Sequence, residues 1–334
     1  MRRLSVFRKP RDHAAATTTT SDQSNLSHFL QLQKVNYLKA VDQGQAKQWT
    51  VVMGNEAGDL DSLASAIAYA WYATNTRKSL TVPLIQSPHA DLPLRAENLH
   101  TLALAGIDPG RDLLCLDDAP FLPLPSDKFA LVDHNTLNPR FAHPGARVIA
   151  VIDHHADEGN HIDTADPRIV AVPTGSCASL VAPLLRDAPD TPSELATLLL
   201  AAICIDTDGL KLGGKAEQAD RDAVALLLPR STLAQQQPSS PTRSTTFATA
   251  AEPALQRLTA ELQAKKSMMR LSWGEVRLVA VNDDDVPVFA AVVHCECVQQ
   301  VSLRAEAVEE EVEPLVELAA KARKLLSVDC FDRF

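Results

Sequence analysis

The sequence has few of the features that would assign it to common classes of protein. Basic residues are in the minority, with 32 Lys and Arg against 42 Asp and Glu and a formal net charge of −10. We therefore expect no nucleic-acid or membrane partner bound through a basic surface. No apolar run reaches the roughly 18 residues of a membrane-spanning helix. An anionic substrate stays compatible with this charge, because bound divalent cations invert the local field.

Motifs of several enzyme classes are also missing. No G-x-S-x-G elbow accompanies Ser62 or Ser176, which disfavours a Ser/His/Asp hydrolase. Neither a Walker A motif nor a dinucleotide-binding fingerprint occurs. The six cysteines are dispersed without C-x-x-C spacing, which predicts buried, reduced thiols in an intracellular, cytoplasmic protein.

What is present is an alternation of short apolar strands and helical segments. The expected strands are 50–53, 81–85, 113–116, 129–132 and 148–152, and the expected helices are 27–41, 62–73 and 177–185. We interpret the apolar stretch 195–205 as a buried helix running into a strand. Short strands separated by helices indicate βαβ units, so the expected fold class is α/β with a mostly parallel sheet flanked by helices.

Composition divides the chain into four parts. Residues 1–25 are predicted to be a disordered tail, although their basic, hydroxyl-rich character is also compatible with a mitochondrial presequence. Residues 26–228 form the α/β domain. Residues 229–253, rich in Ser, Thr, Gln and Pro, are interpreted as a linker or disordered insertion. Residues 254–334 are predicted to form a smaller α+β domain, with strands at 276–281 and 288–293.

The first cluster of chemically active residues follows the apolar strand 50–53. It contains Asn55, Asp59 and Asp61 in the segment Gly-Asn-Glu-Ala-Gly-Asp-Leu-Asp-Ser. Ligands bind outside the carboxyl ends of parallel strands, where such a loop can aim both carboxylates at one point. Two converging carboxylates repel each other unless a cation lies between them. The structural alternative is that this segment only caps the next helix.

Three further clusters repeat this arrangement. Asp133-His134-Asn135 and Asp153-His154-His155 each follow an apolar strand, and Asp206-Thr207-Asp208 follows the apolar stretch that ends at residue 205. Imidazole and carboxylate groups together are common ligands of divalent first-row metals. Two such metals roughly 3.5–4 Å apart form a clamp for in-line displacement at phosphorus. The four clusters therefore predict a two-metal phosphoryl hydrolase.

These motifs, in this order, resemble the DHH phosphoesterase superfamily, which is named for Asp-His-His as in residues 153–155. The resemblance covers about residues 50–214. Residues 54–62 look most like the fungal exopolyphosphatase branch, to which family II inorganic pyrophosphatases and prune-type proteins are related. The pyrophosphatases usually carry His where this chain has Asn55. The resemblance implies a DHH domain followed by a smaller DHH-associated domain, whose match here is poor and whose short length suggests truncation.

The resemblance also implies roles for individual residues. The implied metal ligands, with Asp133 as the bridge between two cations, are Asn55, Asp59, Asp61, Asp133, His154 and Asp206. The implied catalytic residues are His155, Asp133, His134 and Asp153. Of these, His155 would contact the attacked phosphoryl group, and His134 would be an outer or substrate contact. Asp153 would orient its neighbouring histidines in the Asp-His-His motif. Arg95 resembles a position near the phosphate, although it is equally compatible with an ordinary surface residue.

The function that this resemblance implies is hydrolysis of inorganic polyphosphate from its end, with release of orthophosphate. Mn²⁺ or Mg²⁺ would be the cofactor, with Co²⁺ as a further candidate, and Asn55 should shift the preference toward harder cations such as Mg²⁺. Two alternatives stay open. One is a pyrophosphatase or prune-like small-nucleotide phosphodiesterase, and the other is a non-catalytic interaction protein with a degenerate second domain. The sequence does not predict the oligomeric state.

Overall fold

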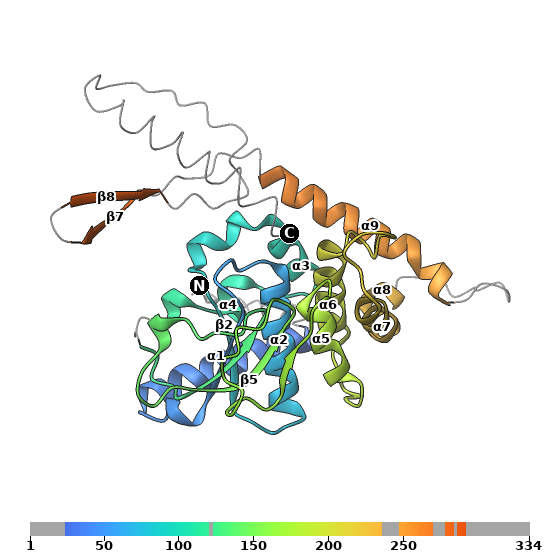
Figure 1. Ribbon diagram of the computed structural model, residues 1–334. Coiled ribbons are helices and arrows are strands. Elements are labelled where there is room, and N and C mark those ends of the chain that lie inside the picture. The colour runs from blue at the N-terminus through green and yellow to red at the C-terminus, as the bar shows by residue number, and fades with distance from the viewer. Residues whose placement is uncertain (1–23, 120–122, 236–246, 270–277, 284–285, 292–334) are drawn as a thin grey trace, which may run out of the picture.

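A six-stranded parallel sheet forms the centre of the protein (Figure 1). The computed structural model describes residues 24–119, 123–235, 247–269, 278–283 and 286–291. The strands of this sheet are β1 (Thr50–Met53), β2 (Thr81–Ile85), β3 (Leu114–Cys115), β4 (Lys128–Val132), β5 (Arg147–Asp153) and β6 (Arg168–Val170). Their order is β3-β2-β1-β4-β5-β6, and every neighbouring pair is parallel. The α/β class and the mostly parallel sheet are confirmed.

Helices pack against this sheet and against one another. They are α1 (Asn25–Asp42), α2 (Leu60–Asn75), α3 (Ala96–Leu104), α4 (Pro109–Asp112), α5 (Cys177–Val181), α6 (Ser193–Asp206), α7 (Gln218–Leu227), α8 (Thr232–Gln235) and α9 (Phe247–Met269). Helix α2 contacts the sheet on one side and α5 and α6 on the other. It is buried almost all round, and its many alanines allow these neighbours to approach closely.

The alternation of side chains along each strand gives the sheet two apolar faces. Val52, Ala130 and Ile152 belong to the larger core, which they share with α2, α5 and α6. Their neighbours Val51, Leu131 and Val151 belong to a second core on the opposite face, together with the aromatic side chains Tyr37, Trp49, Phe129 and Phe141. Successive strand residues point to opposite faces, so a strand covered on both sides is apolar throughout. This explains the continuous apolar runs in the sequence.

Two expectations about secondary structure were wrong. The stretch 195–205 does not run into a strand, because α6 continues to Asp206. Its Leu- and Ala-rich composition favours a helix, and a helix that is apolar all round is one buried in a core. The edge strand β6 was missed, because it has only three residues and all three are partly exposed.

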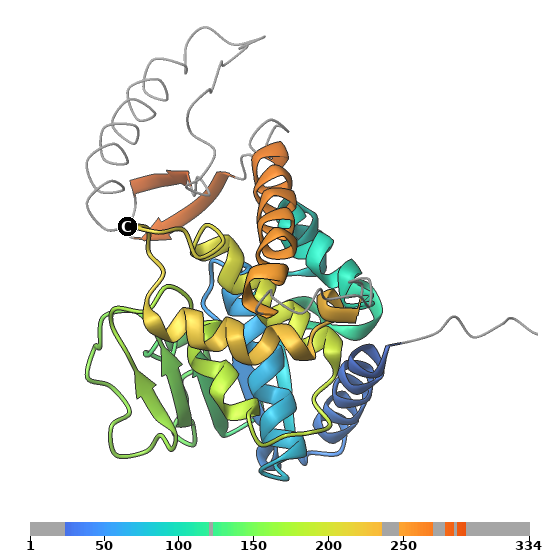
Figure 2. The ribbon, with the colours of Figure 1, turned by 90° about the vertical axis from the view of Figure 1, so that its right-hand side faces the viewer.

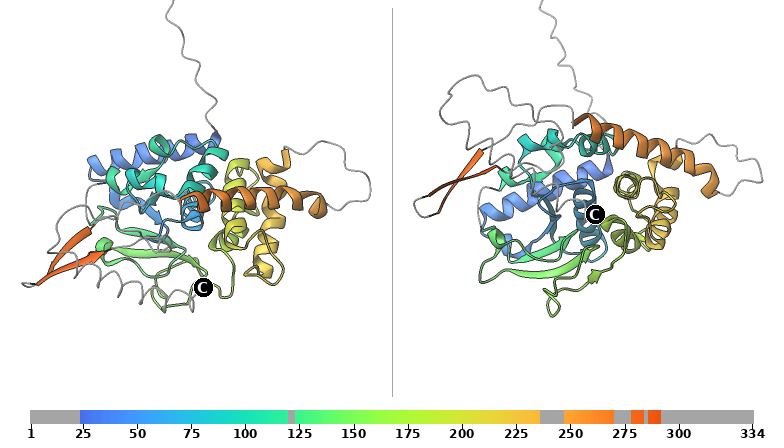
Figure 3. Two further views of the ribbon diagram at one scale, coloured as in Figure 1. Left: turned by 90° about the horizontal axis from the view of Figure 1, so that it is seen from above. Right: turned by 45° about the horizontal axis from the view of Figure 1, so that its top comes forward.

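Part of the chain beyond residue 228 packs on the helices of the α/β domain. Helices α8 and α9 both begin within 229–253, the segment that we interpreted as a linker. Helix α9 packs against α3 and α6, and it buries Leu255, Leu258 and Leu262 in the larger core (Figures 1 and 2). Two views in Figure 3 show α9 lying across the outside of α6. The division of the chain into domains stays a prediction.

The final described elements form a hairpin. Strands β7 (Leu278–Asp283) and β8 (Val286–Ala291) are antiparallel, close to the strands expected at 276–281 and 288–293. The predictions for residues 1–23, and most of those for the second domain, lie outside the described residues. In the part of the chain that the structure describes, no helix is long and apolar enough to cross a membrane.

Candidate metal centre

The predicted clusters meet where the strand order of the sheet reverses. Strands β2 and β3 lie on one side of β1, while β4, β5 and β6 follow on the other. The loops after β1 and β4 diverge at this switch point, which is where ligands bind in open α/β sheets. The first cluster follows β1, the second follows β4, and the third lies at the end of β5. The fourth comes from the C-terminus of α6 rather than from a strand.

The loop after β1 is closely packed on the start of α2. A side chain at Gly54 would place its Cβ 2.5 Å from Cβ of Ser62, so only glycine fits there. Asp59 is the N-cap of α2, where its Oδ1 accepts a hydrogen bond from the Ser62 amide at 3.0 Å. The capping role therefore belongs to Asp59, while Asp61 points into the protein from the first turn and is 2% exposed. Capping and metal binding are compatible, because a carboxylate has two oxygens.

Asp133 is the hub of the centre. It has a φ of 62°, the left-handed conformation that Asp tolerates better than most residues, and it turns the chain sharply at the end of β4. Its Oδ2 accepts hydrogen bonds from Ser62 Oγ at 2.6 Å and from Asn55 Nδ2 at 2.8 Å. Its Oδ1 is buried and has no hydrogen-bond donor, although His154 Nε2 lies 3.1 Å away as an ion-pair partner.

Asp61 is held by the start of α5. Its two oxygens accept hydrogen bonds from the backbone amides of Cys177, at 2.6 Å, and Ala178, at 2.8 Å. Its Oδ2 also lies 3.7 Å from His154 Nε2. Burial, followed by the charge of Asp59, raises the pKa of Asp61, while His154 and the two amides act in the opposite direction.

His154 faces both carboxylates with one ring nitrogen. Its Nδ1 lies 3.0 Å from the carbonyl oxygen of Thr174, which fixes Nδ1 as the donor and leaves Nε2 toward Asp61 and Asp133. A metal-binding histidine is usually oriented in this way by a bond at its other nitrogen. Burial lowers the pKa of His154, but the contact with Asp133 and the charge of Asp61 outweigh it and raise the pKa to about 10.

His155 has a different partner. Its Nδ1 lies 2.8 Å from Oδ1 of Asp153, and this contact raises the pKa of His155. Asp153 is fully buried, and its Oδ2 accepts a 2.6 Å hydrogen bond from Asn135. Asp153 was expected to orient both neighbouring histidines. It contacts only His155, because adjacent residues point in different directions and His154 turns to Thr174 instead.

The ring of His134 is also fixed in orientation by a backbone contact. Its Nδ1 lies 2.9 Å from the carbonyl oxygen of Val132, while its Nε2 is buried without a hydrogen-bond partner. Burial lowers the pKa of His134, which keeps the ring neutral. A neutral ring that donates from Nδ1 presents an acceptor at Nε2, so His134 is suited to accept a hydrogen bond rather than to bind an anionic oxygen.

Asp206 completes the group of acids. Its side chain is partly exposed, yet burial and then the charges of Asp61 and Asp59 raise its pKa well above the usual value. The pKa of Asp133 is likewise raised, to about 7, by burial and then by the charge of Asp61. Four carboxyl groups thus destabilise one another's negative charge. Divalent cations would remove this repulsion.

The donor set therefore fits divalent cations. Carboxylate oxygens of Asp59, Asp61, Asp133 and Asp206 are hard ligands, and His154 adds one borderline nitrogen. Ligand atoms of Asp133, His154 and His155 all lie within 4.8 Å of one another. Asn55 is less suited, because its Oδ1 already accepts a hydrogen bond from the Ala57 amide at 3.0 Å. Its assignment as a ligand stays a prediction.

Arg95 lies beside the first cluster. It stands between a short 3-10 helix (His89–Leu94) and α3, and one guanidinium nitrogen donates to the carbonyl oxygen of Ala57 at 2.6 Å. Its other terminal nitrogen is 3.7 Å from Glu97. The structure thus connects Arg95 with the loop that carries Asn55 and Asp59. A substrate contact by Arg95 stays a prediction.

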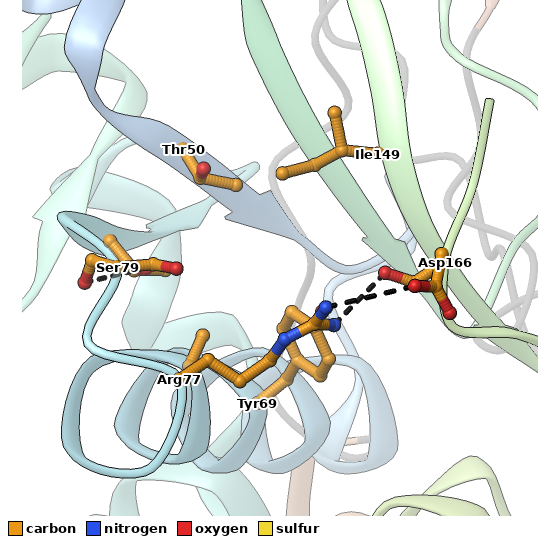
Figure 4. Close-up of a pocket in the computed structure, with 8 residues that line it drawn as sticks. Thr50, Tyr69, Arg77, Ser79, Ile149 and Asp166 are labelled. Atoms are coloured by element: carbon orange, nitrogen blue, oxygen red, sulfur yellow. Dashed lines mark hydrogen bonds and ion pairs between the residues drawn. The ribbon is translucent and has the colours of Figure 1, made fainter.

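Two other places among the described residues have some features of a binding site. His89, Cys115, Asp117 and Asp118 offer clustered ligand atoms, but the Lys34 ammonium lies 2.9 Å from Asp118 and already supplies positive charge there. A pocket of about 210 Å³ lies near the amino ends of β1 and β2 (Figure 4). The candidate metal centre follows the carboxyl ends of the strands, at the other end of the sheet. Arg77 spans it and donates to the Asp166 carbonyl oxygen at 2.9 Å. None of the predicted clusters contributes to the lining of this pocket.

Some residues of the centre were not predicted. The carbonyl oxygen of Thr174 and the amides of residues 177 and 178 are backbone groups, which leave no signal in a sequence. Ser62 was considered only as a helix cap or a nucleophile, and its hydrogen bond to Asp133 was not predicted. Asn135 stood within the second motif but had no assigned role, and it holds Asp153.

Part of this chain is similar to a known protein family. Residues 49–203 match the model of the DHH family, N-terminal domain. These residues are thus similar to the N-terminal domain of the DHH family. The matched segment contains the first three clusters, and Asp206 lies three residues beyond it.

Similar proteins include exopolyphosphatases and a pyrophosphatase. A "Putative exopolyphosphatase" of Schizosaccharomyces pombe is 37% identical over 190 residues, which are 52% of this chain and 49% of that protein. Exopolyphosphatase PRUNE1 of Rattus norvegicus is 35% identical over 53% of this chain and 40% of its own length. A "Probable manganese-dependent inorganic pyrophosphatase" of Shouchella clausii is 29% identical over 47% of each chain. The matches thus span about half the length of these relatives.

Proposed function

We propose that this protein is an exopolyphosphatase, which hydrolyses terminal phosphoanhydride bonds of inorganic polyphosphate and releases orthophosphate. The observation that carries the proposal is the convergence of Asp61, Asp133 and His154 at the switch point of the sheet. The fungal relative and PRUNE1 are both named as exopolyphosphatases, which supports this substrate class. Asn55, at the position where the related pyrophosphatases usually have His, supports it further.

Two divalent cations, Mn²⁺ or Mg²⁺, would be held by Asn55, Asp59, Asp61, Asp133, His154 and Asp206. When bound, they supply positive charge to the phosphoryl oxygens and to the attacking oxygen. His154 would be neutral in the loaded protein, since its Nε2 is then a ligand and its proton stays on Nδ1 against Thr174.

Other side chains would act on the substrate directly. His155, half exposed and oriented by Asp153, would present Nε2 to the phosphoryl group that is attacked. The contact with Asp153 raises the pKa of His155, which favours the charged ring that an anionic oxygen requires. His134 would accept a hydrogen bond from a water molecule or a protonated phosphate oxygen, and Arg95 would bind an adjacent phosphate.

A second candidate is inorganic pyrophosphatase or a prune-like phosphodiesterase activity. The named pyrophosphatase among the relatives favours it, because the same ligand types serve both reactions. A non-catalytic interaction protein is the third reading. The presence of all the acidic ligand candidates in one described centre favours an enzyme over this reading.

The deciding experiment compares substrates with one purified protein. Orthophosphate release from polyphosphate, pyrophosphate and a cyclic nucleotide would be measured with Mn²⁺ or Mg²⁺ added. We expect the highest turnover on polyphosphate. Preference for pyrophosphate would favour the second candidate, and no release from any substrate would reject the enzyme.

A further inference from the structure

The loop of residues 173–176, between β6 and α5, supports the metal centre at two points. The carbonyl oxygen of Thr174 accepts from Nδ1 of His154, and this contact directs Nε2 toward Asp61 and Asp133. Directly after the loop, the amides of Cys177 and Ala178 hold Asp61. A displacement of this loop would therefore move a histidine and a carboxylate of the centre together.

A buried carboxylate from another helix holds this loop. Asp220, in α7, is 0% exposed. Its Oδ2 accepts a hydrogen bond from the Gly175 amide at 2.9 Å, and its Oδ1 accepts one from Ser179 Oγ at 2.5 Å. Gly175 and Ser179 lie on either side of the residues whose amides bind Asp61. Asp220 thus connects α7 to both ends of the turn that enters α5.

Helix capping alone does not account for Asp220. Its Oδ2 also accepts from the Glu217 amide at 2.7 Å, which forms a capping box at the start of α7. On the side of Asp220, a capping box needs only that local bond. The two other bonds reach residues 41 and 45 positions earlier in the chain. Burial of a carboxylate without hydrogen-bond donors would be costly. The bonds from the loop and from Ser179 therefore help to stabilise the buried Asp220.

The fit at Gly175 is close. A Cβ there would lie 2.6 Å from Oδ2 of Asp220 and 2.6 Å from the methyl carbon of Thr207. Thr207 follows Asp206, the fourth acidic cluster. Gly175 therefore lies between Asp220 and Thr207, the residue after the candidate ligand Asp206. A larger residue at position 175 would displace the loop.

We propose that Asp220 is a positioning residue for the metal centre. It fixes the loop so that Nε2 of His154 and the carboxylate of Asp61 face the same point. This inference rests on the proposed function only in taking that point to be a divalent-cation site. It does not depend on which phosphate compound is hydrolysed.

The test measures Mn²⁺ binding as well as turnover. Free Mn²⁺ would be followed by electron paramagnetic resonance during titration of each metal-free variant. Removal of a direct outer contact to a metal ligand costs about 10–100-fold in affinity or activity. Asp220 acts one step further out, through the loop, so we expect Asp220→Ala to lose affinity by about tenfold, the lower end of this range. Asp220→Asn should keep most of the affinity. Its side-chain oxygen can still accept from the amides, and its NH₂ can donate to Ser179.

Two further variants make the test independent of folding failure in Asp220→Ala. Gly175→Ala attacks the same contact from the loop and should also weaken Mn²⁺ binding. Asp222→Asn is the matched control, because Asp222 is exposed on the same helix and, among the described residues, accepts a hydrogen bond from Gln218. It should bind Mn²⁺ as the unmodified protein does. Melting temperatures of the metal-free proteins would be recorded in parallel.

Two results would overturn the inference. One is a lower melting temperature of Asp220→Ala with unchanged Mn²⁺ affinity, since this would reduce Asp220 to a stabilising cap. The other is unchanged Mn²⁺ affinity in folded Gly175→Ala. Failure of the unmodified protein to bind Mn²⁺ at all is a distinguishable result, because it would reject the proposed metal centre itself.

Discussion

The side-chain amide of Asn55 donates a 2.8 Å hydrogen bond to Oδ2 of Asp133, so the weakest predicted ligand contacts the predicted bridge. The Oδ1 of Asn55 is meanwhile bonded to the Ala57 amide. Asn55 therefore adds a neutral donor to a region where several carboxylates repel each other. It stabilises the charge of Asp133 without adding a nitrogen ligand.

Replacement of Asn55 by His should change the metal preference. A ring nitrogen in place of the amide would add a borderline ligand, which favours Mn²⁺ and Co²⁺ over Mg²⁺. The measurement is the turnover and half-saturating concentration of each metal for Asn55→His and for the unmodified protein. An unchanged order of preference would contradict the assignment of Asn55 to the metal site.

Asp133→Ala should abolish phosphate release. The substitution removes the carboxylate that both cations are proposed to share, so its effect should exceed the roughly 10–100-fold loss typical of an outer contact. Orthophosphate release and Mn²⁺ titration would be measured together. Asp190→Ala, at an exposed aspartate, is the control and should leave both unchanged. Full activity in Asp133→Ala would reject the bridging role.

The buried thiols should be unreactive in the folded protein. Cys115, Cys177 and Cys204 are all fully buried, and burial raises the pKa of Cys115 and of Cys204 to about 12. Only the thiolate reacts with alkylating reagents, so labelling near neutral pH should be very slow. Mass spectrometry of peptides should find these three cysteines unmodified until the protein is unfolded. Rapid labelling of the native protein would contradict the described packing.

Asp112 should make stability depend on acid pH. Burial raises the pKa of its carboxyl, but hydrogen bonds from Arg111, Ser27 and the Asp108 amide outweigh this and lower the pKa below its usual value of 3.8. The folded state thus binds its proton less tightly than the unfolded state. Its stabilising contribution is present above the unfolded pKa and is lost as the pH falls through the folded one.

We therefore expect Asp112→Asn to lower the free energy of unfolding by about 1–3 kcal/mol at neutral pH. The difference from the unmodified protein should shrink in acid, where Asp112 itself is protonated. Urea unfolding of both proteins over a pH series would measure it. A difference that stays constant down to the most acidic pH at which both fold would refute this account.

Helix α9 should contribute to the stability of the α/β domain. Leu262 is 0% exposed in the core shared with α3 and α6. Leu262→Ala should lower the free energy of unfolding by about 2–5 kcal/mol, the usual cost of such a truncation in a core. Leu212, which is 88% exposed, provides the control, and Leu212→Ala should cost less than about 0.5 kcal/mol. Equal effects in a urea titration would contradict the packing of α9.

The sequence predicted the sheet well because its central strands are covered on both faces. Such strands are continuous apolar runs, and β1, β2, β4 and β5 were all found near their expected bounds. The edge strand β6 has no such run, and α6 resembled a strand at its end because it is apolar on every side. The apolar runs in the sequence therefore report how deeply a segment is buried, and not whether it is a strand or a helix.

The candidate site was predictable only in its titratable side chains. Asp and His residues at strand ends are visible in the sequence, and the structure brings Asp61, Asp133 and His154 together. The hydrogen-bond partner of each histidine could not be read from the sequence. His154 bonds a backbone carbonyl and His155 a carboxylate, which depends on how each ring turns. Asp220 lies far along the chain, where its spacing from Glu217 indicates only a cap.

The position of α9 sets a practical limit on how short a stable piece of this protein can be. The matched segment ends at residue 203, which invites expression of a fragment without the later helices. Such a fragment would uncover the apolar sides of α3 and α6 that Leu255, Leu258 and Leu262 cover. Exposed patches of this kind promote self-association. A fragment made for crystallisation should therefore keep α9, even though the family match ends more than forty residues earlier.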